Sequence, residues 1–269
     1  MTTLCPQPMR IAAVAALLLL ASTAPAHAED REFCADRPGF DTPPCTLLPG
    51  VVMVETGLVA IAHTSGGGAI DDTLTFGDVL VRVGVAQSAE IEVGLTSFVR
   101  DRQRDASGVS TTRGVGDMVV AVRRGIAGPN GPIALHAFVT LPTGKSGIGA
   151  GDWGAGLIVP MQFDLGHQFQ LALSPEIDAA VNASGSGRHV QYGSAIGLSH
   201  PLSKAVSLTG EMAAFRNDEP TGHETLAQAA ASLAWQASKN WQLDLEGDAG
   251  LSKAAPDYQF KLGFAHRFR

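Results

Sequence analysis

The sequence predicts an all-β protein, a closed antiparallel transmembrane β-barrel of about 12 strands of the bacterial outer-membrane type. Three observations predict this fold: long segments in which apolar and polar side chains alternate, an even number of such segments, and connections that are mostly tight at one end and mostly longer at the other. A composition with 31 glycines and only 17% charged residues excludes a disordered chain. The net charge of −7 argues against a nucleic-acid partner, because phosphates need cationic side chains.

The first 28 residues have the pattern of a cleaved export signal. Arg10 precedes an apolar run over residues 11–21, and Ala26-His27-Ala28 is a small-x-small cleavage site. The run is shorter than the roughly 20 apolar residues that a helix needs to span a bilayer, which argues against a retained anchor. We therefore expect a signal peptide at 1–28, a periplasmic N-terminal segment at 29–50 and a transmembrane barrel at 51–269.

Cys34 and Cys45 would be the only cysteines of the exported chain. Their close spacing and an oxidising compartment predict a disulfide, which stabilises so short a loop by roughly 2–3 kcal/mol. Two free thiols are the alternative. The surrounding residues 31–46 offer carboxylates but no histidine, so we expect neither a metal site nor a cofactor.

Residues 241–251 show the predicted strand pattern most clearly. Leu243 and Leu245 share one parity, and Asp244 and Glu246 share the other. Because successive side chains of a strand point to opposite faces, one face is apolar and the other is acidic. The segments are longer than the roughly five to six residues of an ordinary strand. About 9–11 tilted residues cross a membrane as a β-strand, which these segments supply.

Twelve such segments can be marked. They begin near Val51, Leu74, Ala89, Gly114, Gly131, Asp152, His167, His189, Lys204, Glu224, Asn240 and Pro256. An even number lets the barrel close without unpaired edges and leaves both chain ends on one side. Tight turns are expected at 165–168 and 237–240, and longer external loops at 100–113, 141–151 and 216–223.

Aromatic side chains gather near both ends of the predicted strands, like the girdles of membrane barrels. One rim carries Phe163, Phe169, Trp235, Trp241 and Phe268, and the other carries Trp153, Tyr192 and Tyr258. The first rim is the expected periplasmic one, because it has the tight turns and the C-terminus.

Charged side chains on the lipid face would each cost a few kcal/mol near mid-membrane, so parity assigns them to the lumen. The residues expected to line the lumen are Glu55, Arg82, Glu92, Arg123, Glu176, Asp178, Glu211, Asp244, Glu246, Asp248 and Lys261. The same parity assigns Glu90 and Arg100 inward. Two interpretations remain open: a structural ion-pair network that fills a narrow barrel, or a pore that favours cations and neutral solutes over anions.

Several ordered motifs carry a resemblance to a known family. They are Cys34-Ala35-Asp36-Arg37-Pro38, Phe76-Gly77-Asp78, Gly114-Val115-Gly116-Asp117, Leu141-Pro142-Thr143-Gly144, Pro175-Glu176-Ile177-Asp178 and Gly263-Phe264-Ala265-His266-Arg267-Phe268. Together they resemble the outer-membrane "transporter" family named after the MetA pathway of phenol degradation. The resemblance implies a barrel that passes small hydrophobic or aromatic compounds, and it supplies no catalytic residues.

We therefore expect a passive, non-enzymatic channel of the bacterial outer membrane. Its expected partners are outer-membrane lipid, the barrel-assembly machinery and a small-molecule solute. A lipase-like or protease-like barrel is one alternative, with His63 or His223 near a rim Ser or Asp, although no Gly-x-Ser-x-Gly motif is present. A sealed structural barrel is the other. The solute, the oligomeric state and whether residues 29–50 enter the pore stay open.

Overall fold

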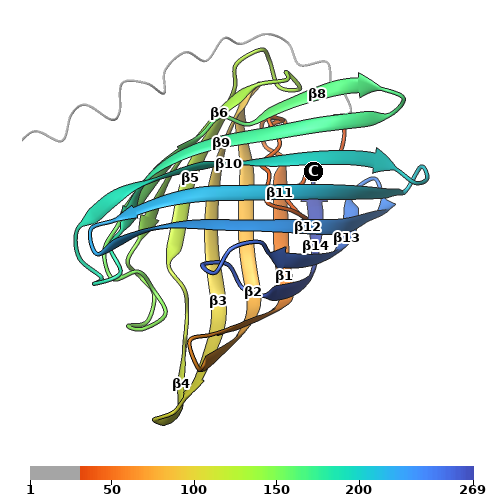
Figure 1. Ribbon diagram of the computed structural model, residues 1–269. Helices are drawn as coiled ribbons and strands as arrows, with labels where there is room; N and C mark the ends of the chain where they lie inside the picture. Colours follow the sequence, from red (N-terminus) through yellow and green to blue (C-terminus); the bar gives the residue numbers. More distant parts are fainter. Residues whose placement is uncertain (1–30) are drawn as a thin grey trace, which may run out of the picture. The chain divides into compact units, whose positions relative to one another are not determined.

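A computed structural model describes residues 31–269, so the predicted signal peptide at 1–28 lies outside the described residues. The described chain folds into β-segments joined by turns (Figure 1). Their bounds are β1 Val52–Gly66, β2 Ala69–Ala86, β3 Ala89–Asp105, β4 Gly108–Gly114, β5 Met118–Gly125, β6 Ala134–Leu141, β7 Gly154–Ile158, β8 Met161–Gly166, β9 Phe169–Val181, β10 Arg188–Pro201, β11 Val206–Glu219, β12 Gly222–Ser238, β13 Trp241–Gly250 and β14 Tyr258–Phe268. Within residues 31–269 no helix combines the length and apolar character needed to cross a membrane.

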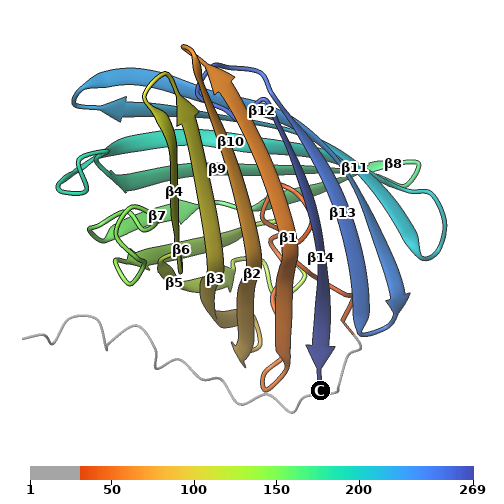
Figure 2. The same cartoon turned by 90° about the horizontal axis from the view of Figure 1, so that it is seen from below.

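The segments pair antiparallel into a closed ring. β1 pairs with β14, and the other strands pair with their neighbours along the chain except at two interruptions, β4/β5 and β7/β8; Figure 2 shows β14, β1, β2 and β3 side by side. β4 and β5 both pair with β3 and form one interrupted strand. β7 and β8 likewise share β9, and the interruption falls at Pro160, which has no N–H to donate. The ring therefore has 12 strands, which confirms the predicted fold class.

The expected two-sided pattern is present on the strands. On β13 the Leu245 side chain is 54% exposed, whereas its neighbours Asp244 and Glu246 are each 2% exposed. The predicted aromatic girdle residues are all exposed as well. An outer surface of large apolar side chains around a buried ionic interior is the arrangement that a lipid-embedded barrel requires.

Two of the three expected long loops are strand hairpins instead. β3 continues to Asp105 and β4 begins at Gly108, while β11 runs to Glu219 and β12 begins at Gly222. The expected loop at 141–151 is largely irregular. The loop predictions at 100–113 and 216–223 are wrong because both faces of these hairpins are polar. Their strands keep the backbone ladder but lose the apolar alternation from which a strand is recognised.

The strand phase changes part-way along the first strands, and this overturns the inward assignment of Arg100. A bulge at Leu58 shifts the register of β1 against β14. Beyond it, Arg100 lies opposite Leu74, and Leu74 lies opposite Ile61, whose side chain is 51% exposed. Residues directly opposite on neighbouring strands share a face. Arg100 therefore lies on the outer face, because one inserted residue reverses every later side chain.

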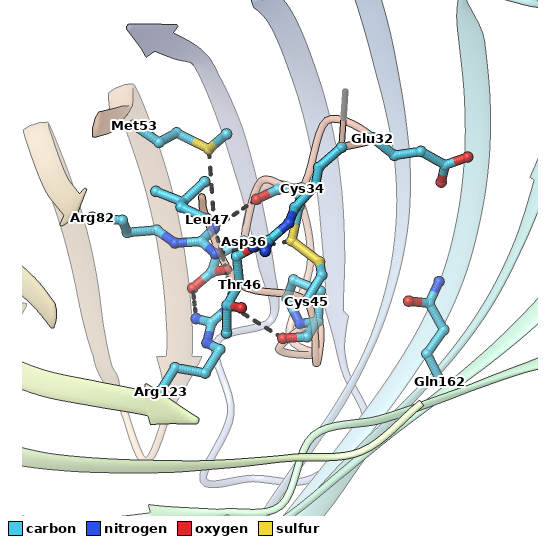
Figure 3. Close-up of a disulfide and its surroundings, with 12 residues drawn as sticks. Glu32, Cys34, Asp36, Cys45, Thr46, Leu47, Met53, Arg82, Arg123 and Gln162 are labelled. Atoms are coloured by element: carbon cyan, nitrogen blue, oxygen red, sulfur yellow. Dashed lines mark hydrogen bonds and ion pairs between the residues drawn. A yellow bond between two sulfur atoms is a disulfide. The ribbon is translucent and has the colours of Figure 1, made fainter. Parts of the chain in front are cut away.

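The described part of the N-terminal segment lies inside the barrel. Residues 31–47, here called the plug, contact inward side chains of β1, β11 and β13. Cys34 and Cys45 form the predicted disulfide, with Cα atoms 6.3 Å apart. Figure 3 shows this disulfide surrounded by the strands. The sequence assigns residues 29–50 to the periplasm and leaves their entry into the pore open; these contacts show that the plug enters it.

Candidate functional site

Two fully buried arginines form the centre of the lumen, Arg82 on β2 and Arg123 on β5. The Arg82 guanidinium lies 2.9 Å from Glu55 Oε1 and 2.7 Å from Glu90 Oε1. Arg123 Nη2 lies 2.9 Å from Glu92 Oε1. All five residues are 2% exposed or less. The structure thus brings together four of the predicted lumen residues and Glu90.

The plug completes this ionic cluster through Asp36 (Figure 3). One Asp36 oxygen lies 2.8 Å from Arg82 Nη1, and the carboxylate also pairs with Arg123. Arg82 donates to the Cys34 carbonyl at 2.7 Å, and Arg123 donates to the Pro43 carbonyl at 3.1 Å. Buried charges of this kind are tolerated only when they are paired and hydrogen-bonded. The plug therefore supplies partners that the barrel wall alone does not.

Carboxylates of the wall bind the plug by accepting its backbone N–H groups. The donors and distances are Arg37 to Glu55 at 3.1 Å, Gly39 to Glu246 at 2.9 Å, Phe40 and Asp41 to Glu211 at 2.8 and 2.9 Å, and Leu47 to Glu90 at 2.7 Å. Gly39 has φ +117°, and a Cβ atom there would collide with the Glu211 carboxylate. The inward acidic face, for which a structural ion-pair network and a pore were the two interpretations, is therefore in part a binding surface for the plug.

Side chains of β13 and β14 hold the same part of the plug. Asp244 Oδ1 lies 3.0 Å from Arg37 Nη2. Lys261 Nζ lies 2.8 Å from both Glu246 and Asp248. The Lys261 ammonium also lies 4.9 Å from the centre of the Phe40 ring, within cation–π range. The predicted residues Asp244, Glu246, Asp248 and Lys261 are thus one cluster at the plug.

A cavity of about 400 Å³ remains between the plug and the wall. Its polar lining includes the carboxylates of Asp78, Asp117 and Glu176, and its apolar lining includes Leu80, Leu95, Phe138 and Ile158. Asp178, two residues beyond Glu176, has a buried carboxylate oxygen without a hydrogen-bond partner among residues 31–269. Of the predicted pair, Glu176 therefore lies at the cavity rather than at the plug anchors, and Asp178 is not among the residues that line the cavity.

Among residues 31–269, neither rim histidine, His63 or His223, has a serine hydroxyl as its hydrogen-bond partner, as an activated serine nucleophile would require. His63 Nδ1 lies 2.7 Å from Asp72, but the Ser65 hydroxyl donates to Asp257 at 2.6 Å. His223 Nδ1 lies 3.2 Å from Asp218. Over residues 31–269 there is also no group of three or more His, Cys, Asp or Glu side chains suited to a metal ion.

A family model described as "Putative MetA-pathway of phenol degradation" matches residues 35–268. The chain belongs to this family. No curated protein matches it. It is similar in structure to an outer-membrane channel from Pseudomonas putida F1, with 15% identity, a TM-score of 0.64, and coverage of 86% of this chain and all of the other.

Two autotransporter barrels resemble this member of the MetA-pathway family less closely. The β domain of BrkA from Bordetella has 13% identity, a TM-score of 0.54, and coverage of 82% of this chain and all of that one. The translocator domain of NalP from Neisseria meningitidis has 13% identity, a TM-score of 0.52, and coverage of 81% and 88%. These likenesses show the outer-membrane barrel fold.

Sequence reasoning missed the plug contacts of this family member. The side chains that anchor the plug include Asp36 and Arg37, and most of the other anchors are backbone N–H and carbonyl groups, which are common to nearly all residues. One signal was present: the motif Cys34-Ala35-Asp36-Arg37-Pro38 is one of those that carry the family resemblance. Nothing in its spacing pairs it with Glu55 or Asp244.

Acidification should tighten the plug. Burial raises the pKa of Asp41 from 3.8 to about 6, against a hydrogen bond with Glu211 that lowers it. The docked plug therefore holds a proton between about pH 4 and 6 that a released plug loses, so docking is strongest below this window and weakens as the pH rises through it. We expect docking about tenfold tighter at pH 5 than at pH 7.

This pH effect can be measured as a lower open fraction in bilayer recordings at pH 5 than at pH 7. Asp41→Asn, which cannot ionise, should show a smaller difference between the two pH values. A wild-type open fraction that does not change with pH, or an equal pH effect in Asp41→Asn, would contradict the role of Asp41.

Proposed function

We propose that this protein is a passive, non-enzymatic channel of the bacterial outer membrane, and that its own N-terminal plug controls passage. The observation that carries the proposal is the way in which the plug is held. Most of its anchors are ion pairs and hydrogen bonds, and its apolar contact within the described chain is limited to Leu47, Phe33 and Ala35, which pack in a small cluster with Val51 and Met53. The cavity of about 400 Å³ remains beside it. Polar groups that anchor the plug can form hydrogen bonds with water instead when the plug moves. A large apolar contact between plug and wall could not be replaced by water in this way.

The cavity supports a preference for neutral or cationic solutes. Its carboxylates Asp78 and Asp117 repel anions, while Leu80, Leu95 and Phe138 offer an apolar surface to an aromatic or aliphatic body. The family description names phenol degradation, and a solved structure with this fold is called an outer-membrane channel. The family description supports small aromatic compounds as the solute class, and the likeness to a channel is in keeping with passage through the barrel.

Flux through proteoliposomes tests this function. We expect a neutral phenol and an aromatic ammonium to enter faster than an aromatic carboxylate of similar size, by about threefold or more, because the acidic lining disfavours the anion. Asp78→Asn should reduce that discrimination, and Arg188→Gln on the outer surface should not.

Two outcomes would overturn the proposal. No flux of any solute, together with no conductance, would indicate a sealed structural barrel. Lipase or protease activity of the folded protein, lost on substitution of His63 or His223, would indicate an enzyme. Each outcome is read from the same purified, heat-modifiable barrel.

A further inference from the structure

The β3–β4 hairpin has charges of opposite sign on its two faces. It projects beyond the neighbouring strands at the end of the barrel away from the C-terminus (Figure 1). On β3, Arg100, Arg102 and Arg104 alternate with Asp101, Gln103 and Asp105. Since neighbouring side chains of a strand point to opposite faces, the three arginines share one face of the hairpin.

The basic face is continuous with the outer, lipid-facing surface. Arg100 lies in one row across the sheet with Leu74, Ile61 and Phe260. The Ile61 and Phe260 side chains are 51% and 58% exposed. The next row towards the barrel centre includes Phe76, which is 44% exposed. The arginines therefore begin where the apolar outer surface ends.

Two arginines of the basic face, Arg100 on β3 and Arg113 on β4, have no carboxylate beside them among residues 31–269. Arg100 lies directly opposite Arg113 of β4, and both are exposed. Neither makes an ion pair with any residue between 31 and 269. Like charges directly opposite on paired strands are destabilising, and a bound anion would offset the repulsion between these two guanidinium groups. Arg102 and Arg104 share the single carboxylate of Asp72, at 3.9 and 3.8 Å.

We propose that Arg100 and Arg113, with Arg102 and Arg104 beside them, bind the phosphate groups of an anionic glycolipid in the outer leaflet. The guanidinium group suits phosphate because its planar fork donates two parallel hydrogen bonds. The boundary of an apolar belt is the depth at which lipid headgroups lie. The hairpin belongs to the end with the longer connections, which is the external end in outer-membrane barrels.

A lipid explains this surface better than a free anion or a protein partner. A lipid whose phosphate bound here would place its acyl chains alongside Ile61, Phe76 and Phe260. One ligand would then cover both the basic row and the apolar rows. The acidic face of the hairpin, with Asp71 and Asp101, lies on the other side. The charge segregation thus directs the arginines towards the membrane.

Native mass spectrometry of the full chain folded in neutral detergent tests the proposal. Bisphosphorylated lipid A is the probe, and dephosphorylated lipid A and inorganic phosphate are the comparison ligands. We expect Arg100→Gln/Arg113→Gln to weaken lipid A binding about tenfold, because two charge-assisted contacts are lost. Arg124→Gln is the matched control, since Arg124 is an exposed arginine opposite Ala89 near the other rim.

We expect Arg124→Gln to bind lipid A as the wild type does. Dephosphorylated lipid A should bind about tenfold more weakly than lipid A to the wild type and to Arg124→Gln. Equal binding by the double variant and the wild type would overturn the site. Displacement of lipid A by equimolar inorganic phosphate would overturn the lipid as the ligand. If the wild type formed a dimer that the double variant lost while lipid binding was unchanged, the arginines would bind a second copy of the chain, which would also overturn the proposal. Folding is checked by heat-modifiable mobility. If the double variant does not fold, no weakening in either single variant would overturn the proposal.

Discussion

Leu245→Arg should reduce the yield of folded barrel severely. Leu245 lies in the middle of β13 with its side chain 54% exposed on the outer face. An arginine facing lipid at mid-membrane costs about 2–4 kcal/mol. We expect most of the variant to remain unfolded in lipid vesicles, measured as loss of the heat-modifiable band on gels.

Two matched variants separate this effect from general disruption. Asp244→Asn changes the adjacent inward residue, which is 2% exposed, and should fold in good yield although it weakens the contact with Arg37. Leu251→Arg places the same charge just beyond the end of β13 and should also fold, because the cost falls towards the interface. Equal folded yields of Leu245→Arg and Asp244→Asn would contradict the strand phase.

Arg82→Met should destabilise the folded barrel by about 3–5 kcal/mol. The substitution leaves Glu55 and Glu90 buried beside Asp36 of the plug, with fewer cations to balance them. Removing one member of a buried ionic cluster costs more than the pair itself contributed, because the remaining charges stay desolvated. Urea unfolding in detergent, followed by tryptophan fluorescence, measures the loss.

A second substitution should restore part of that loss. Arg82→Met/Glu90→Gln removes one of the stranded carboxylates and should recover stability relative to Arg82→Met alone. Arg188→Met is the surface control: Arg188 pairs with Asp152 at 2.8 Å while partly exposed, so about 1 kcal/mol or less is expected. If Arg82→Met cost no more than Arg188→Met, the central cluster would not stabilise the fold.

The barrel could be predicted from sequence because lipid imposes a simple rule on every strand. Leu245 must face hydrocarbon and Asp244 must avoid it, so the alternation is visible in the residue order itself. This rule does not apply to strand segments that extend beyond the lipid. The β3–β4 hairpin is charged on both faces, so its strands were expected as a loop, and the bulge at Leu58 reversed the phase that assigned Arg100 inward.

The position of the plug could not be predicted in the same way. Arg37 and Asp244 are in contact although 207 residues separate them. No periodicity links two such positions. The hydrogen bonds donated by the backbone N–H groups of Gly39 and Phe40 cannot be recognised from residue types, because nearly every residue has such a group. Parity gave the inward acidic set, including Glu55 and Glu211, but not the ligand of those carboxylates. That ligand turned out to be the chain itself.

Single-channel conductance with and without the plug tests the central claim most directly. The full chain should show low conductance with brief openings, and Thr42→Cys/Ser174→Cys, which joins positions whose backbone N and hydroxyl lie 2.9 Å apart, should hold it closed until a reductant is added. A chain that lacks residues 31–47 should conduct steadily and several-fold more. Equal conductance of the full chain and the chain without its plug would contradict the account.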